Sequence, residues 1–481
     1  MMRRWTFLAA CAAALGLLAA PGIPVSALAQ SVQNDCLTAS PPGCYTPQQF
    51  RTAYDIQPLL DRGIDGRGET VTVIVFAADP ATPPPVVTDI RQDLATFDGL
   101  FRLPPAHISV VTTLARASSP WDATLEEIID TEIVHAVAPG AALRVVLMPN
   151  PPQSTPASTA ADMLAALPLA IRDTDVVSFS GALGEHFFSP AQVAQMRGIL
   201  RQAADRHVTV VAASGDSGAV SDVYGFGTTP VKEVSLPASN PYVLGVGGTT
   251  LTASPQTGSY IGETAWNQIE PGGANFASGG GFSGTFARPA YQDGVPGTEA
   301  TRGVPDVAGD ASTGMALARE AGGGSYELGS AGGTSAATAL WGGLVADADQ
   351  LAGHDLGFIN PALYQIARSP EYRRAFHDIT TGNNTVLING TTYTGYQAGP
   401  GWDPVTGLGS PNAAVLVPNL SGKPINIRIG RKTPTPIRVG AGLEPLPCGQ
   451  AAQHDQRCRR RPCARRGRGR CLWGSKTGIV S

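Results

Sequence analysis

The α/β fold is indicated most directly by residues 192–218, which read QVAQMRGILRQAADRHVTVVAASGDSG. Apolar residues recur at helical spacing from Gln192 to Arg206, and the continuous apolar run Val208 to Ala213 follows almost at once. A short run of this kind, ended by the turn residues Ser214 to Gly218, predicts a strand buried on both faces. Asp216 would then lie at the carboxyl end of that strand, where open α/β sheets place their reactive loops.

Three runs earlier in the chain have the same strand-like character, namely Val71 to Val75, Leu143 to Leu147 and Val176 to Ser180. Strands that alternate with helical segments predict an α/β fold with a doubly wound, mainly parallel sheet and helices on both faces. The 57 glycines and 40 prolines, with only 15% charged residues, indicate many tight turns, as in extracellular hydrolases. A chain of 481 residues is long enough to bury a large core of this kind.

Residues 1–29 are predicted to be an export signal. Arg3 and Arg4 precede the apolar run 5–20, and Ala27 to Ala29 form a small-x-small cleavage site. No later segment is apolar over the length that a membrane span needs, so we expect a soluble secreted protein, extracellular or periplasmic. Acylation at Cys11, as in lipoproteins, is disfavoured because the apolar run continues past that residue.

The seven cysteines avoid the central part of the chain, which excludes cysteine-protease chemistry. Cys36 and Cys44, in an N-terminal extension of residues 30–45, flank a Pro-Pro-Gly loop, and a disulfide between them would suit an oxidising compartment. The basic tail, residues 421–481, carries fourteen Lys or Arg from Lys423 onward but no interleaved aromatics. We therefore expect a disordered tail or a shifted reading frame there, and no nucleic-acid partner.

An acidic helix is predicted from Thr124 to Ala138. At about 100° per residue, its apolar arc includes Glu126 and Asp130. The opposite, solvent-facing side is predicted to carry Glu127, Thr131 and His135. Two carboxylates on one buried face repel each other and lose hydration, and this cost in stability indicates that the pair has a structural or chemical role. The spacing alone leaves open a capping pair, a metal-ligating pair, a pairing with buried Arg and a catalytic pair.

A candidate nucleophile, Ser335, lies in the glycine-rich stretch GSAGGTSAA, residues 329–337. The glycines would let a substrate backbone approach, and a small-residue helix predicted from Ala336 to Gly342 would favour developing negative charge at its amino end. A serine in this place is equally typical of a helix cap. None of the seven histidines stands in a His-Gly-Thr context, so the usual histidine base has no candidate.

Seven short motifs carry a resemblance to a known family. They are, in chain order, Tyr45-Thr46-Pro47, Val234 to Ser239, Gly247 to Thr249, Ala265 to Asn267, Ser278 to Gly281, Gly303 to Val307 and Gly407 to Pro411. In this order they resemble the sedolisin family, the serine-carboxyl peptidases. The resemblance covers residues 46–420 and implies a subtilisin-like α/β fold and a serine-type endopeptidase.

The resemblance also implies roles for four residues. Glu126 would be the general base and acid, with Asp130 as its orienting partner. Ser335 would be the nucleophile, and Asp216 would donate to the oxyanion. A carboxylate accepts the serine proton only when it is ionised, whereas Asp216 donates only when it is protonated, and this combination favours acidic pH.

A second family motif lies near the end of the predicted domain. Asp378-Ile379 and Gly399-Pro400-Gly401-Trp402-Asp403 resemble the calcium loop of the sedolisins. The implied ligands of one structural Ca²⁺ are the carboxylates of Asp378 and Asp403 and the carbonyls of Ile379, Gly399 and Gly401. Oxygen-only ligation in a glycine-rich loop suits this ion.

The sequence departs from the family pattern at three places. Gly181 stands where related peptidases often have Trp, and Ala339 stands four residues after the serine where Pro is usual. Neither change removes a reactive group. The long propeptide of the family is not found between the export signal and Tyr45, so we expect folding without it or with one supplied otherwise.

We therefore expect a secreted, acid-acting, monomeric endopeptidase that cleaves protein or peptide substrates. Release of tripeptides is the alternative within the family. A catalytically dead binding protein on this scaffold is the alternative outside it, although all four reactive positions are filled. A histidine-based subtilisin is disfavoured because the histidine motif is missing.

Overall fold

The computed structural model describes residues 44–77, 88–112, 122–149, 154–221, 230–269, 275–312, 314–322, 325–423 and 425. The predicted export signal, Cys36 and almost all of the basic tail lie outside these residues. Cys44, the first described residue, is disulfide-bonded. Of the helices in the described ranges, none combines the length and the apolar character that crossing a membrane requires.

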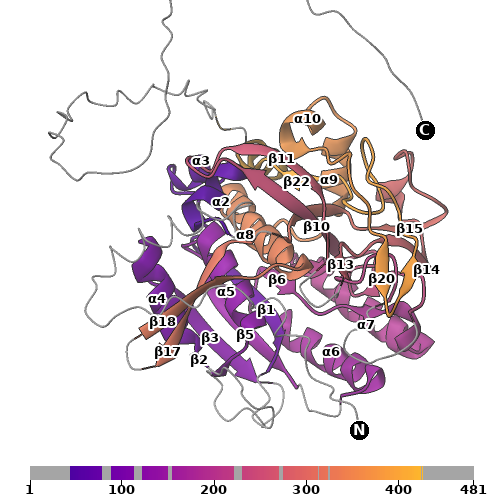
Figure 1. Ribbon diagram of the computed structural model, residues 1–481, viewed down its shortest axis with the longest axis horizontal. Helices are drawn as coiled ribbons and strands as arrows, with labels where there is room; N and C mark the ends of the chain where they lie inside the picture. The colour runs from indigo at the N-terminus through magenta and orange to yellow at the C-terminus, as the bar shows by residue number, and fades with distance from the viewer. Residues whose placement is uncertain are drawn as a thin grey trace, which may run out of the picture. The chain divides into compact units, whose positions relative to one another are not determined.

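A central sheet of eight strands organises the described chain (Figure 1). Its strand order is β11 (Tyr260–Ala265), β10 (Leu244–Ala253), β8 (Thr209–Ala213), β6 (Val176–Phe179), β1 (Thr70–Phe76), β5 (Ala142–Met148) and β3 (His107–Thr112), and β16 (Val307–Asp310) pairs with β10 beside this path. Every pairing is parallel except that of β10 with β11. The prediction of a mainly parallel sheet is confirmed, and the carboxyl ends of its central strands gather at one edge.

Helices cover both faces of this sheet, as the alternation of strands and helices predicts. One face is covered by α5 (Leu125–Val137) and α8 (Thr334–Ala352), with α2 (Pro47–Ala53) and α11 (Ala413–Leu420) packed against them, and the other by α6 (Pro156–Ala170) and α7 (Pro190–Asp205). Alternate side chains of β1 serve the two faces. Val71, Val73 and Val75 join the core under α5 and α8, whereas Ile74 joins the core under α6 and α7.

The remaining elements are short or peripheral. They are α3 (Gln57–Leu60), β2 (Thr88–Asp89), α4 (Ile90–Phe101), β4 (Asp122–Ala123), β7 (Leu183–Gly184), the 3₁₀ turns Glu185–Phe187 and Ala290–Gln292, β9 (Ser235–Leu236), β12 (Asn267–Ile269), β13 (Asn275–Ala277), β14 (Gly281–Ala287), β15 (Thr301–Val304), β17 (Ala316–Gly322), β18 (Ser325–Ser330), α9 (Asn360–Ala367), α10 (Tyr372–Ala375), β19 (Phe376–His377), β20 (Val386–Ile388), β21 (Thr391–Tyr393) and β22 (Ser410–Pro411).

Helix α8 is much longer than the predicted segment Ala336 to Gly342, and Gly342 and Gly343 lie in its middle. A Cβ on Gly343 would come within 2.7 Å of Val137 Cβ on α5, and a Cβ on Gly342 within 3.3 Å of Ser178 Cβ on β6. The glycines therefore allow α8 to approach its neighbours closely. This contact sets the spacing between the helix that carries Ser335 and the helix that carries Glu126.

The prediction that Glu127, Thr131 and His135 face solvent is wrong, since all three are fully buried. Helix α4 and strand β17 pack over that side of α5. His135 Nε2 lies 2.9 Å from Asp98 Oδ1 of α4, and Thr131 Oγ1 donates to the Glu127 carbonyl at 2.7 Å. Helix α5 is therefore buried on both sides, and Glu126 and Asp130 are carried by an element of the core.

Candidate active site

Glu126 and Asp130 are placed by the start of α5. Thr124 caps this helix, and its Oγ1 accepts a hydrogen bond from Glu127 N at 3.2 Å. Glu126 therefore lies in the first turn, and Asp130 lies one turn further on the same face. The two carboxyl groups share one helix face, as the spacing predicts, and the structure places them beside Ser180, which follows β6, and Asp216, which follows β8.

Ser180 holds Asp130 in place. This serine directly follows β6, and its Oγ donates to Asp130 Oδ1 at 2.8 Å and to Oδ2 at 2.9 Å. Asp130 has no exposed surface, and its burial, with the nearby charge of Glu126, raises its pKa well above the usual range. Because the two carboxyl groups interact strongly, Glu126 and Asp130 titrate as one unit.

Glu126 interacts both with Ser180, the partner of Asp130, and with Ser335, the candidate nucleophile. Burial raises the pKa of Glu126 to about 7, and the charge of Asp216 acts in the same direction. Hydrogen bonding to Ser335 and Ser180 opposes this rise. The Oε1 atom of Glu126 is nevertheless buried without a well-formed hydrogen bond to any described residue, so an acceptor oxygen is available beside Ser335.

Ser335 is the second residue of α8, and only 7% of it is exposed. The chain enters the helix through Gly333, whose φ of 100° is unfavourable for a side chain. The amide of Ala336 donates to the Gly333 carbonyl at 3.1 Å, whereas the amide of Ser335 has no hydrogen-bond partner among the residues described. A free N–H at the positive end of a helix is a ready donor to an anion.

Asp216 lies at the same helix end, in the turn that follows β8. Its Oδ1 accepts hydrogen bonds from Thr334 N at 2.8 Å and Thr334 Oγ1 at 2.7 Å, and that hydroxyl accepts from Gly215 N at 3.2 Å. A Cβ on Gly333 would lie 2.8 Å from Asp216 Oδ2. Burial raises the pKa of Asp216 despite the bonds from Thr334, and this rise favours the protonated form that can donate.

Two positioning residues escape the sequence interpretation, Ser180 and Thr334. Both are polar residues at places that the interpretation already marks. Ser180 directly follows a buried strand, and Thr334 directly precedes the candidate nucleophile. The available signal was therefore their position next to predicted site elements, since their residue types alone are ordinary.

A pocket opens beside Asp216. Its walls include Glu233, Ser235, Gly279 and Gly280. Cβ atoms on Gly279 and Gly280 would each come within 2.2 Å of a backbone carbonyl oxygen, so these two positions require glycine. Glu233 accepts a hydrogen bond from His186 N at 3.0 Å. This space is a narrow crevice in the structure, without room for a water molecule, and it lies next to the reactive groups.

The predicted calcium ligands converge in one loop. The amide of Gly401 donates to Asp378 Oδ1 at 3.0 Å, and the amide of Gly399 donates to Asp403 Oδ2 at 3.2 Å. The carbonyl oxygens of Ile379, Gly399 and Gly401 accept no hydrogen bond within the described part of the chain. Burial raises the pKa of Asp403 to about 6. Two carboxylates and three free carbonyl groups fit the oxygen ligands that Ca²⁺ takes.

Comparisons with known proteins agree with this geometry. A sequence model of the subtilase family matches residues 110–360. Kumamolisin of Bacillus sp. (strain MN-32) is 36% identical over 384 residues, which cover 77% of this chain and 62% of kumamolisin. Tripeptidyl-peptidase 1 of Homo sapiens is 30% identical over 353 residues, which cover 68% of this chain and 57% of that protein.

A solved structure gives the same result. The structure of Pseudomonas sedolisin, a serine-carboxyl proteinase complexed with two molecules of pseudo-iodotyrostatin, matches with a TM-score of 0.63 and 26% identity, over 79% of this chain and 98% of that chain. The chain spans less than two thirds of the length of these two curated relatives. The family match, the order of the motifs and the shared fold together show that this chain belongs to the sedolisin family of the subtilases.

Proposed function

We propose that this chain is an acid-acting serine-carboxyl endopeptidase that works through an acyl-enzyme on Ser335. The observation that carries the proposal is the meeting of three groups at the amino end of α8. Ser335 lies there beside Glu126, which has an available acceptor oxygen, and beside Asp216, whose pKa is raised. A nucleophile, a base and an oxyanion donor are the minimum set for acyl transfer.

Acylation follows from these positions. Ionised Glu126 accepts the proton of Ser335 Oγ while this oxygen attacks the substrate carbonyl carbon. The oxyanion that forms accepts hydrogen bonds from protonated Asp216 and from the free amide of Ser335. Glu126 then gives its proton to the departing amine, which leaves an ester on Ser335. A water molecule, deprotonated by Glu126, hydrolyses this ester by the same steps in reverse.

The pH range of activity is set by two opposite requirements. Activity falls as pH drops through the pKa of Glu126, because the base becomes protonated. Activity also falls as pH rises through the pKa of Asp216, because the donor becomes ionised. The raised pKa of Glu126 moves the lower limit upward, and the raised pKa of Asp216 extends the upper limit. Between these two pKa values only the fraction of molecules that has Glu126 ionised and Asp216 protonated is active, and this fraction is largest there, so we expect weakly acidic operation.

We further propose one structural Ca²⁺ in the loop of Asp378 and Asp403, with the carbonyls of Ile379, Gly399 and Gly401 as its other protein ligands. The ion would supply positive charge that holds the two carboxylates and the three carbonyl groups together. Residues of the chain already position this loop, since Tyr372 OH donates to Asp378 Oδ1 at 3.2 Å and Thr406 Oγ1 donates to Asp403 Oδ2 at 2.9 Å. The ion stabilises the fold and takes no part in the proton transfers.

Secretion is proposed from two features. Residues 1–29 have the pattern of an export signal, and Cys44 is disulfide-bonded, which is typical of oxidising compartments. Protein or peptide substrates and a monomeric state complete the proposal.

The test is hydrolysis of casein by the purified protein from about pH 3 to pH 8, with products identified by mass spectrometry. We expect internal cuts and a maximum on the acidic side of neutrality. Products that consist only of N-terminal tripeptides would instead establish the tripeptidyl-peptidase alternative. Binding of peptides without turnover at every pH would overturn the proposal in favour of a dead scaffold.

A further inference from the structure

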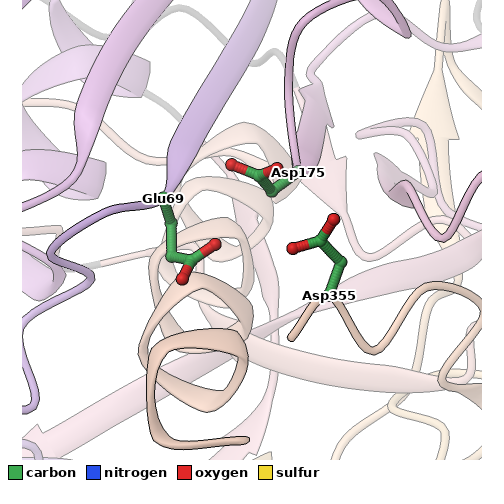
Figure 2. A group of neighbouring side chains, drawn as sticks. All are labelled: Glu69, Asp175 and Asp355. Carbon is green, nitrogen blue, oxygen red and sulfur yellow. The ribbon is translucent and has the colours of Figure 1, made fainter. Parts of the chain in front are cut away.

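A second group of carboxylates lies at the edge of the sheet opposite to the candidate active site. Glu69 directly precedes β1, Asp175 directly precedes β6, and Asp355 lies in the loop that follows α8. One carboxylate oxygen from each of the three lies within 4.8 Å of the other two. Figure 2 shows the three carboxyl groups turned toward one shared space. These residues come from three distant parts of the chain, so the fold itself builds the group.

The charges of this acidic group are not compensated within the described chain. Glu69 and Asp355 form no ion pair and accept no side-chain hydrogen bond there, and Asp175 accepts only one, from Thr70 N at 2.7 Å. All three side chains are half-buried. Burial and the charges of Asp175 and Asp355 raise the pKa of Glu69 to about 7. Half-buried like charges without a counter-charge destabilise a fold.

A fourth, fully buried carboxyl belongs to the same acidic group. Asp349, near the end of α8, has no exposed surface, and its Oδ1 accepts from Leu356 N, next to Asp355, at 2.8 Å. Its Oδ2 is buried and has no hydrogen-bond partner among the described residues. Burial raises the pKa of Asp349 to about 8, with contributions from the charges of Glu69, Asp355 and Asp175. An unpartnered buried oxygen beside three carboxylates indicates that a group is missing from its surroundings.

The helix end adds to the negative potential. The carboxyl end of α8, capped at Gly353, carries the negative end of the helix dipole. Lys423 Nζ lies 3.4 Å from the place that a Cβ on Gly353 would take, but this amine forms no ion pair with the acidic group. A cation bound between the carboxylates would remove the repulsion and give Asp349 Oδ2 a partner.

We propose that Glu69, Asp175 and Asp355 bind one Ca²⁺, with Asp349 as a fourth carboxyl ligand or as a partner of the ion's water. The ligand atoms are all oxygens, which favours a hard cation. Oxygens bound to Ca²⁺ at about 2.3–2.6 Å lie up to about 5 Å apart across the ion, so three oxygens within 4.8 Å of one another can share one such ion. The ion would tie the amino ends of β1 and β6 to the end of α8.

This site is separate from the loop of Asp378 and Asp403, and it does not depend on the proposed peptidase activity. Its consequence for the molecule is mechanical. Helix α8 begins at the candidate nucleophile and ends at the acidic group, so the ion would anchor the far end of the helix that carries Ser335.

The test is thermal unfolding of the full chain, with Ser335→Ala as the parent so that self-digestion is absent. Tm is measured with EDTA and with CaCl₂ for the parent, Asp355→Asn, Glu69→Gln and the matched control Asp205→Asn, whose side chain is exposed and outside the acidic group. Asp355→Asn should melt above the parent in EDTA, because repulsion is relieved, and below the parent in CaCl₂, because a ligand is lost. The control should show no such reversal.

A Tm of Asp355→Asn that equals or exceeds that of the parent in both solutions would overturn the site. Should Asp355→Asn fail to fold, Glu69→Gln is judged by the same reversal. Equilibrium dialysis with Ca²⁺ separates the two calcium proposals. Asp378→Asn should lose the ion of the loop and retain the ion of the acidic group. Glu69→Gln should bind the ion of the acidic group at least about tenfold more weakly, because affinity follows the number of charged ligands. Equal Ca²⁺ binding by Glu69→Gln and the parent would also overturn the proposal.

Discussion

The carboxyl groups at the two ends of helix α8 are in opposite circumstances. At the amino end, Asp216 accepts two hydrogen bonds from Thr334, and the helix dipole favours negative charge there. At the carboxyl end, Asp349 Oδ2 has no partner within the described chain, and the dipole adds to the repulsion between acids. The same helix therefore offers one end to the oxyanion of the proposed reaction and the other end to the proposed cation.

The comparison also shows that a raised pKa alone does not identify an active site. Burial raises the pKa of Asp347 and of Glu132 well above the usual range, although the charges that act on them belong to other residues, Asp65 and Arg51 for Asp347 and Asp93 and Asp98 for Glu132. The candidate active site differs because its acids are arranged around a nucleophile and are held by hydroxyl groups. Geometry, and not the direction of the pKa, selects the functional acids.

The largest expected effect comes from Ser335→Ala. This change removes the nucleophile at the amino end of α8, so hydrolysis of a peptide should fall at least about a thousandfold in kcat/KM, while the protein stays folded. Tm in CaCl₂ should remain within a few degrees of that of the wild type. Retention of more than about a tenth of the wild-type rate would refute the role of Ser335.

The next effect concerns Asp216. Asp216→Ala removes a donor to the oxyanion and should cost about a hundredfold in kcat across the pH range. Asn donates without needing a proton, so Asp216→Asn should keep more activity and lose less of it as pH rises. The limb at low pH should persist in both variants, because it reports ionisation of the pair Glu126 and Asp130. A wild-type rate for Asp216→Ala would show that Asp216 is only a turn residue.

The sequence predicted more of the candidate active site than of the acidic group. The helical spacing of Glu126 and Asp130 and the place of Asp216 after a strand are local properties, and the structure has both of them. The resemblance supplied the roles. Glu69, Asp175 and Asp355 could not be found in this way, because three separate segments meet only after the sheet and α8 have packed.

The mistaken side of α5 has the same cause. Periodicity shows which residues share a helix face, but it does not show what covers the other face. Helix α4, the preceding helix, and strand β17, which lies far along the chain, cover it together. The predicted helix Ala336 to Gly342 was too short, and Gly342 and Gly343 lie in the middle of α8. Their role is close approach to β6 and α5, which is a property of partners that local sequence does not reveal.

A smaller effect is expected at Ser180. Its hydroxyl lowers the pKa of both Glu126 and Asp130, so Ser180→Ala should raise these values and move the low-pH limb of kcat/KM to higher pH. The loss at the optimum should be about tenfold, since a hydrogen bond to a charged group is removed. Ser178→Ala is the matched control, because this buried hydroxyl has no hydrogen-bond partner among the described residues. An unshifted limb in Ser180→Ala would mean that Ser180 only fills space.

The smallest effect should come from the loop of Asp378 and Asp403. Its carboxylates already accept hydrogen bonds from Gly401 and Thr406, whereas Glu69 and Asp355 accept none within the described chain. Losing an ion from the loop therefore leaves less uncompensated charge than losing one from the acidic group. We expect chelation to lower Tm of both Asp355→Asn and Asp378→Asn, but less in Asp355→Asn, which keeps only the loop site. An ion at a hundredfold excess over its Kd stabilises the native state by about 3 kcal/mol, so calorimetry with added CaCl₂ resolves the difference. A Tm of Asp355→Asn that responds neither to EDTA nor to CaCl₂ would show that the loop of Asp378 and Asp403 binds no ion.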